Sequence, residues 1–312
     1  MTNSYRSRHT AQPGIGDSTH VARLQSGQME AVRKQLLTRA LECKDPISQF
    51  QAGLIYIDSA MVQTNYAKAA IWFSRAAKAG HAQAQFNLGL LYLSGNGVAR
   101  DANKALYWMS KAGEQGLAEA QNNVAVLYER GDGCMQDHQR AFEWYQRAAA
   151  KGLAKAQYNL ACAFKNGDIV GQDVNKAFSW FQKAARQGHR KAQLCLANMY
   201  AHGDGVVRNE VEAEKWYTTV AKDSDPNFQV DIALKYYSGN GLPKDYDKAA
   251  KWLCRAAKQG SSRALFNLAM LHLCGGSAKL NRKRALHLLN MAARRGYPKA
   301  QYYLEKLRKE ND

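Results

Sequence analysis

Residues 84–98 read AQFNLGLLYLSGNGV, and this stretch decides the fold. Its apolar residues have the spacing of a helix, which the Gly-Asn-Gly sequence at 95–97 ends. Asp101 is placed to cap a second helix, and Gly116 ends that helix where a positive φ is needed. The apolar face of the second helix consists of Ala105, Trp108, Met109 and Ala112. Residues 82–117 are therefore predicted to form a helical hairpin.

The hairpin repeats with a period of 36 residues, which holds for seven units without an insertion. All six tryptophans share one position of the repeat: Trp72, Trp108, Trp144, Trp180, Trp216 and Trp252. A glutamine recurs in the first helix, as Gln49, Gln85, Gln121, Gln157, Gln193, Gln229 and Gln301. A fixed period of this kind is typical of a solenoid, whose units bury their apolar faces only by stacking on neighbours. We therefore predict that the tryptophan rings lie in the core between hairpins.

These residues resemble the Sel-1-like repeat, a longer relative of the tetratricopeptide repeat, over about 46–304. The resemblance implies an all-α, right-handed superhelical solenoid that acts as an adaptor in protein complexes and signalling. We expect a disordered basic tail at 1–28, an N-terminal capping helix at 29–45, and seven repeats at 46–297. A C-terminal capping helix and tail are expected at 298–312.

Composition and charge narrow the class of protein. Hydrophobic residues make up 46% of the 312 residues, so a packed core is expected, and the formal net charge of +18 makes an anionic partner worth testing, be it nucleic acid, a membrane surface or an acidic protein. No apolar run approaches the roughly 18 residues of a membrane span, and the N-terminus has no hydrophobic signal region. We expect a cytoplasmic protein. A mitochondrial targeting segment is the alternative interpretation of the N-terminal tail.

No residues form a recognisable catalytic or metal-binding motif. The six cysteines occupy six different positions of the repeat, so we expect reduced thiols. Some secreted members of the family carry a cysteine pair in each repeat and are linked to β-lactam binding or hydrolysis, and this sequence lacks those pairs. The Gly-x-Gly stretches follow helices and lack the Lys-Ser/Thr of a phosphate loop. We expect no cofactor, no metal and no enzymatic activity.

The first helix of each hairpin is expected to line a concave groove, as in related helical repeats. The candidate partner-binding residues are Asn87, Asn123, Arg130, Lys155, Asn159, Lys191, Asn198, His202, Asp231, Lys235, Arg263 and Asn267. The asparagines shared by one position could hold an extended peptide, or each could bond the backbone of the adjacent hairpin. The basic residues would make the groove attractive to carboxylates, or would form an ordinary solvated row.

The junction of the fifth and sixth units departs from the repeat. Ser224 replaces a glycine, Pro226 follows it, Phe228 replaces an alanine, and Lys235 stands where leucine is usual. A serine at a positive φ is strained, and a buried lysine needs a partner such as Asp231 or must point into the groove. We therefore predict a bend or a binding hot spot at this junction.

The seventh unit, residues 262–297, contains seven basic residues and no acidic residue. We expect a basic patch there, formed by Arg282, Lys283, Arg284, Arg294 and Arg295. Together these features predict an adaptor that binds a protein or peptide, possibly an acidic one, in its groove. A basic solenoid that binds nucleic acid is the first alternative, and a hydrolase acting on lactam or cell-wall substrates is the second.

Overall fold

The computed structural model describes residues 26–42, 44–57, 64–167, 169–222, 224–274 and 281–309. Within these ranges it contains sixteen α-helices and no strand, which confirms the all-α prediction. The predicted tail lies outside the described residues, except for 26–28. The chain divides into two units, residues 1–163 and residues 164–312.

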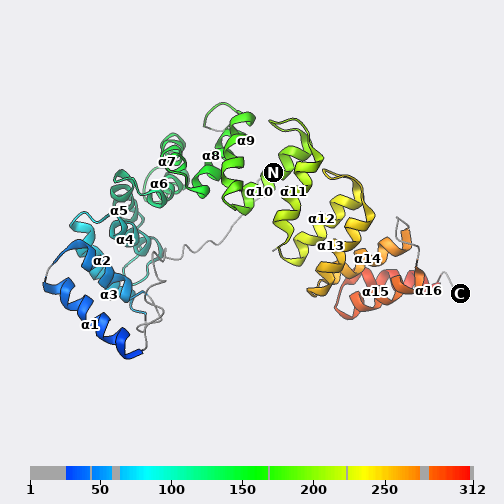
Figure 1. The fold of residues 1–312 in the computed structure, drawn as a ribbon, viewed down its shortest axis with the longest axis horizontal. Coiled ribbons are helices and arrows are strands. Elements are labelled where there is room, and N and C mark those ends of the chain that lie inside the picture. The colour runs from blue at the N-terminus through cyan, green and yellow to red at the C-terminus, as the bar shows by residue number, and fades with distance from the viewer. Residues whose placement is uncertain are drawn as a thin grey trace. The chain divides into compact units, whose positions relative to one another are not determined.

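In the first unit, α1 spans Ser26–Glu42, and three hairpins follow it. They pair α2 (Pro46–Ile55) with α3 (Tyr66–Lys78), α4 (Ala82–Ser94) with α5 (Ala102–Glu114), and α6 (Ala118–Arg130) with α7 (His138–Ala150). The next helix, α8, spans Ala154–Asn166. Figure 1 shows α2 to α7 following one another as a row of hairpins.

The second unit repeats this arrangement. After the last residues of α8 it contains α9 (Val174–Arg186), and three hairpins follow. They pair α10 (Arg190–His202) with α11 (Glu210–Lys222), α12 (Pro226–Ser238) with α13 (Tyr246–Lys258), and α14 (Ser262–Cys274) with α15 (Arg282–Arg294). The last helix is α16, Pro298–Lys309, which packs on α15.

The predicted helix boundaries have clear local causes. The Asp101 carboxylate caps α5 by accepting a hydrogen bond from the Lys104 amide at 3.0 Å, and Asp137, Asp173 and Asp245 cap later second helices in the same way. Gly116 has φ +90°, as its position required. A Cβ on Gly97 would lie 2.2 Å from the backbone carbon of Tyr66, so this turn must be glycine for the hairpins to pack closely.

The tryptophans are less buried than predicted. Trp72 is 9% exposed, while the rings of the other five are half-buried. The ring lies at the margin between hairpins: Trp144 of α7 packs on the cluster that contains Met109 and Ala112 of the preceding hairpin and Ala120 of its own hairpin. Its outer face is covered by Arg147, whose guanidinium is 4.7 Å from the ring centroid. The ring therefore joins two hairpins and also contacts a surface cation.

The junction before α12 accommodates its unusual residues differently from the prediction. Among the described residues, Lys44 is the only non-glycine with a positive φ, so the strain predicted at Ser224 is absent. Ser224 is buried, and its Oγ donates to the Val220 carbonyl and accepts from Arg190. Pro226 lies in the first turn of α12, where no amide donor is needed, and Asp225 caps that turn.

The packing around this junction is nevertheless irregular. Phe228 is only partly buried, although the alanines at the same position, such as Ala192 and Ala264, are fully buried. A Cβ on Gly205 would meet Val174 at the start of the preceding second helix, whereas one on Gly241 would meet Ala201, Lys235 and Tyr217. The turn after α12 therefore packs against different residues from the turn after α10.

Candidate functional site

The recurring glutamine, whose role the sequence did not reveal, is a structural residue. At five of the seven positions, its Nε2 donates to a backbone carbonyl eight residues earlier, at the end of the preceding second helix. The five bonds are Gln85 to Ala77, Gln121 to Gly113, Gln157 to Ala149, Gln193 to Ala185, and Gln229 to Ala221. The glutamine thereby satisfies carbonyls that a helix end leaves unpaired. This position holds the hairpins together and offers little to a ligand.

The recurring asparagines do not form one exposed ladder. Asn87 is 3% exposed, so it cannot reach a ligand on the surface. Asn159 donates to the side-chain oxygen of Asn122 at 3.2 Å, and Asn267 donates to the Arg263 carbonyl of its own helix at 2.8 Å. The alternative expectation, a bond to the backbone of the adjacent hairpin, does not describe these two bonds either. Asn123 is half-buried on α6.

Asn198 and His202 lie together on α10. The Tyr217 hydroxyl donates to the side-chain oxygen of Asn198, which ties that amide to a buried ring. His202 is exposed, and its Nδ1 lies 2.8 Å from the Asn198 carbonyl. Of the two, His202 is the side chain that remains open to solvent.

The cations of the predicted groove are mostly exposed. Arg130 and Lys155 are exposed in the first unit, and Lys191 and Lys299 are exposed in the second. Arg263 differs, because its guanidinium pairs with the Asp231 carboxylate at 2.9 Å. This ion pair joins α14 to α12.

Lys235 does not pair closely with Asp231, which was one of the two alternatives for this lysine. Its Nζ lies 4.8 Å from the centre of the Tyr217 ring, and burial lowers the pKa of the lysine. The Asp231 charge opposes that shift without contacting the ammonium closely enough to form an ion pair with it. Lys235 is therefore a desolvated cation held against an aromatic ring.

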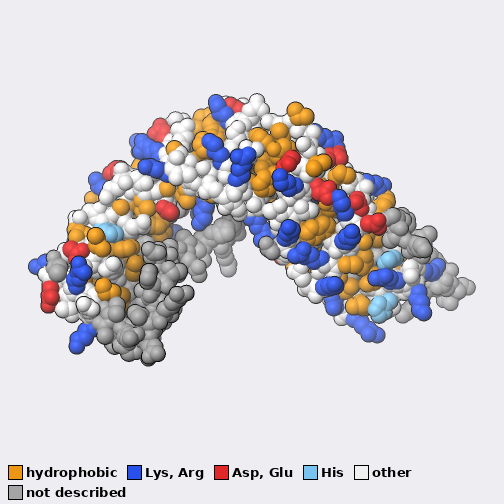
Figure 2. All heavy atoms as spheres, in the orientation of Figure 1, with side chains coloured by type: hydrophobic (Ala, Val, Ile, Leu, Met, Phe, Trp, Pro, Cys, Tyr) orange, Lys and Arg blue, Asp and Glu red, His pale blue; other side chains and the backbone are white. Residues whose placement is uncertain are grey.

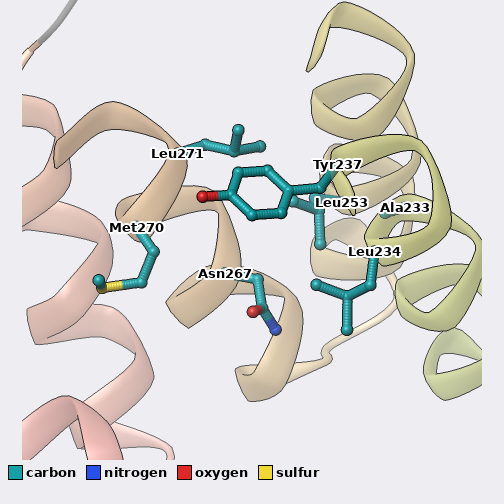
Figure 3. Close-up of a pocket in the computed structure, with 7 residues that line it drawn as sticks. All are labelled: Ala233, Leu234, Tyr237, Leu253, Asn267, Met270 and Leu271. Atoms are coloured by element: carbon teal, nitrogen blue, oxygen red, sulfur yellow. The ribbon is translucent and has the colours of Figure 1, made fainter. Parts of the chain in front are cut away.

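A small pocket lies in the second unit, between α12 and α14. It has a volume of about 120 Å³ and is lined by Ala233, Leu234, Tyr237, Leu253, Asn267, Met270 and Leu271. Figure 3 shows Tyr237 and Leu234 extending from α12 toward Asn267, Met270 and Leu271 of α14. Of the lining residues, Asn267 is among those that the sequence predicts to face the groove. The pocket itself was not predicted, because it depends on how the two helices separate.

The basic patch on the seventh hairpin is exposed. Arg282, Lys283, Arg284, Arg294 and Arg295 are all exposed, and Figure 2 shows Lys and Arg side chains gathered over this end of the second unit. Arg282 donates to the Leu307 carbonyl at 3.4 Å. Among the described residues, no carboxylate forms an ion pair with the other four.

The repeat explains why Arg284 has no such partner. The equivalent cations Lys104, Arg140 and Lys176 each pair with the aspartate that caps their helix. In α15 the capping residue is Asn281, which is neutral. The seventh hairpin therefore keeps the cap and loses its negative charge.

Two features bear on other functions. Within the described residues, no group of three or more His, Cys, Asp or Glu side chains could hold a metal ion. No helix in the described part of the chain is long and apolar enough to cross a membrane.

Comparison with protein families matches the Sel1 repeat to seven segments, residues 46–81, 82–117, 118–153, 154–189, 190–224, 227–261 and 262–297. Two residues, 225 and 226, fall between the fifth and sixth segments, at the irregular junction. No curated protein gives a significant match.

Two solved structures are similar over most of the chain. A protective antigen of uropathogenic Escherichia coli strains that displays an SLR fold is 33% identical, with a TM-score of 0.76. The match covers 88% of this chain and 59% of that one, so this chain spans less than two thirds of the antigen. A Sel1 repeat protein from Oxalobacter formigenes is 29% identical, with a TM-score of 0.64, and the match covers 91% of this chain and 82% of that one.

Proposed function

This chain belongs to the Sel1 repeat family, and we propose that it is a non-catalytic scaffold that binds a partner protein along the exposed side of its first helices. Sel1 repeat proteins are generally protein-interaction scaffolds and are typically not enzymes. Here the binding surface is called the first-helix face. It comprises Gln83, Glu119, Asn123, Arg130 and Lys155 in the first unit, and Lys191, Asn227, Asp231, Arg263 and Lys299 in the second.

The observation that carries this proposal is the contrast between constant packing and a variable surface. The glutamine bonds and the aspartate caps recur from unit to unit with nearly the same geometry. At one exposed position of the first helix, by contrast, the residue changes from Gln83 to Glu119 to Lys155. Packing requires the same residue everywhere, whereas recognition of one partner requires different residues at successive points.

We place the scaffold in the cytoplasm. Cys134, Cys195 and Cys254 are free thiols, and burial raises the pKa of Cys134 and of Cys195. Unreactive free thiols suit a reducing compartment.

Selection from a random peptide library, followed by measurement of Kd, tests the proposal. The test variant carries Arg130→Glu and Lys155→Glu on the first-helix face of the first unit. Its control carries Lys78→Glu and Lys151→Glu, which make the same charge change at exposed ends of second helices. Selected peptides that use this part of the face should bind the test variant about fivefold more weakly, and the control within about twofold of the parent.

If no peptide is selected, or if every selected peptide loses affinity only in the control, the first-helix face is not the binding surface. A duplex or single-stranded oligonucleotide that binds more tightly than any peptide, with a steep salt dependence, would instead favour nucleic-acid binding.

A further inference from the structure

We propose that the pocket between α12 and α14 holds an apolar side chain of an acidic segment of the partner, and that the acidic residues of this segment lie over Lys299 and Lys306 of α16. This inference rests on the proposed function and specifies the ligand class for the surface beside Asp231, Arg263 and Lys299 of the first-helix face. Two properties of the second unit carry it, namely the lining of the pocket and the distribution of charge beside it.

The lining suits an apolar side chain. Six of the seven residues around the pocket have apolar or aromatic side chains, and Asn267 is the seventh. Tyr237 is 39% exposed, so a ligand that covers its ring would remove apolar surface from water. The Tyr246 ring packs edge-to-face on the Tyr237 ring, with the two ring centroids 5.5 Å apart. A pocket of about 120 Å³ between supported side chains can receive one anchor residue.

Asn267 supplies a polar contact for the main chain of a ligand. Its Nδ2 is held by the Arg263 carbonyl, which fixes the orientation of the amide. The amide oxygen is then the atom that can accept a hydrogen bond from a peptide N–H. One amide acceptor beside an apolar pocket is the arrangement by which a groove fixes an extended peptide.

The charged side chains beside the pocket differ between α12 and α16. On the α12 side stands Asp231, whose carboxylate is paired with Arg263. On α16, the positions equivalent to Arg263 and Met270 are Lys299 and Lys306, and both are exposed. Glu305 follows a different face of α16, about 100° around the helix from Lys306. Because Arg263 already neutralises Asp231, a ligand carboxylate is attracted most strongly toward the exposed cations of α16.

The helix spacing sets the spacing within the ligand. Neighbouring packed helices lie about 8–10 Å apart, and an extended chain advances about 3.3 Å per residue. The acidic residues should therefore stand about three positions from the anchor residue. A run of acidic residues directly beside the anchor would not reach Lys299 and Lys306.

The test uses fluorescein-labelled peptides and the full chain. The parent peptide has one leucine and a pair of aspartates about three residues away. Matched peptides replace the leucine with serine, replace the aspartates with asparagine, or place the aspartates directly beside the leucine. Kd is measured by fluorescence polarisation at low and high salt, and a single-stranded oligo-dT serves as the nucleic-acid probe.

The variants use residues that the repeat already tolerates. Leu234→Asn with Met270→Asn makes the pocket polar. The fold should tolerate both changes, because Asn198 occupies the same repeat position. Lys299→Gln with Lys306→Gln removes the charge, since glutamine occupies the position of Lys299 at Gln83. The control for the pocket variant is Val207→Asn with Val211→Asn, at two exposed apolar sites, and the control for the charge variant is Lys222→Gln with Lys258→Gln, which removes two exposed charges at the ends of α11 and α13.

We expect the pocket variant to weaken the parent peptide about tenfold at either salt concentration. The charge variant should weaken it about fivefold at low salt and hardly at all at high salt. Both controls should bind as the unchanged protein does. With the unchanged protein, the serine peptide should lose as much affinity as the parent peptide loses with the pocket variant. The asparagine peptide should lose as much affinity as the parent peptide loses with the charge variant.

Equal binding of the leucine and serine peptides, or an unchanged Kd in the pocket variant, would overturn the inference. So would tighter binding of oligo-dT that depends on Lys299 and Lys306. If none of these peptides binds, the inference fails. Peptides selected from the random library that respond to Arg130 and Lys155 would then show that the proposed function survives without it.

Discussion

Gln229 illustrates how a single side chain can link three helices. It is fully buried, its Nε2 donates to the carbonyls of Ala221 and Ser224, and its Oε1 accepts from Gln259 at 2.9 Å. Gln85 accepts from Gln115 in the same way in the first unit. Each of these bonds satisfies a polar group that the helix end or the turn would otherwise leave buried and unpaired.

We predict that Gln229→Leu lowers the free energy of unfolding by about 1–3 kcal/mol, because it leaves two carbonyls and the Gln259 amide without their partner. Urea denaturation followed by circular dichroism measures the change. Gln301→Leu is the matched control, since Gln301 has the same repeat position and is exposed. Equal effects at the two sites would mean that the buried bonds do not matter.

His81 caps α4 through an unprotonated ring nitrogen. Its Nδ1 accepts a hydrogen bond from the Ala84 amide at 3.2 Å, and burial lowers the pKa of the histidine below its ordinary value of 6.5. The unfolded chain therefore takes up a proton at a higher pH than the folded chain does. The contribution of neutral His81 to stability should be fully present above pH 6.5 and should be lost as the pH falls below this value.

We predict that His81→Asn reduces this loss, because asparagine caps a helix and does not titrate. The melting temperature of each protein between pH 8 and pH 5 provides the measurement, and the difference between the two profiles isolates His81 from the other histidines. The absolute stability of the variant can fall, since the ring of His81 stacks on Phe50. Parallel profiles would contradict the role of His81.

At the scale of elements, the stability of a hairpin depends on its neighbour. We predict that Trp144→Ala destabilises the first unit by about 3 kcal/mol, at the lower end for aromatic truncation because the ring is only half-buried. Tyr107→Ala is the control, because Tyr107 is an exposed aromatic residue on another second helix. Thermal unfolding should shift strongly for Trp144→Ala alone. If the two variants melt together, the tryptophan does not join the hairpins.

The junction before α12 yields two opposite expectations. Ser224→Gly should lower the free energy of unfolding by about 1 kcal/mol, since it removes the hydroxyl that bonds Val220 and Arg190. Lys235→Leu should raise it by about 1 kcal/mol, since it replaces a desolvated ammonium with an apolar side chain. Urea denaturation of each variant checks the signs. The strain that the sequence predicted at Ser224 would make glycine stabilising there, so a gain in stability for Ser224→Gly would reinstate that interpretation.

At the scale of the whole molecule, the 36-residue period predicted the structural features that recur in successive repeats. The helix ends, the aspartate caps and the turn glycines depend on local chemistry, and their positions agree with the prediction. The pocket could not be predicted, because it depends on the separation of α12 and α14. The buried state of Asn87 and the Asp231–Arg263 pair also escaped prediction, because each depends on which neighbouring side chain is nearest in space.

The net charge of +18 is unevenly placed, and this gives the last prediction. Arg282→Glu, Arg284→Glu and Arg295→Glu together reverse three exposed cations on one hairpin. The control Lys78→Glu, Lys151→Glu and Lys258→Glu makes the same change in net charge at scattered exposed sites. A polyanion that contacts several clustered cations at once binds more tightly than one that meets them singly.

We therefore expect the clustered variant to elute from immobilised heparin at a clearly lower salt concentration than the control. The slope of log K against log salt should fall by about two to three in the clustered variant, as expected when three contacts are lost. Circular dichroism at each salt concentration verifies that both variants stay folded. If the two variants elute together, the affinity follows total charge, and the α15 cations are not a distinct surface for acidic partners.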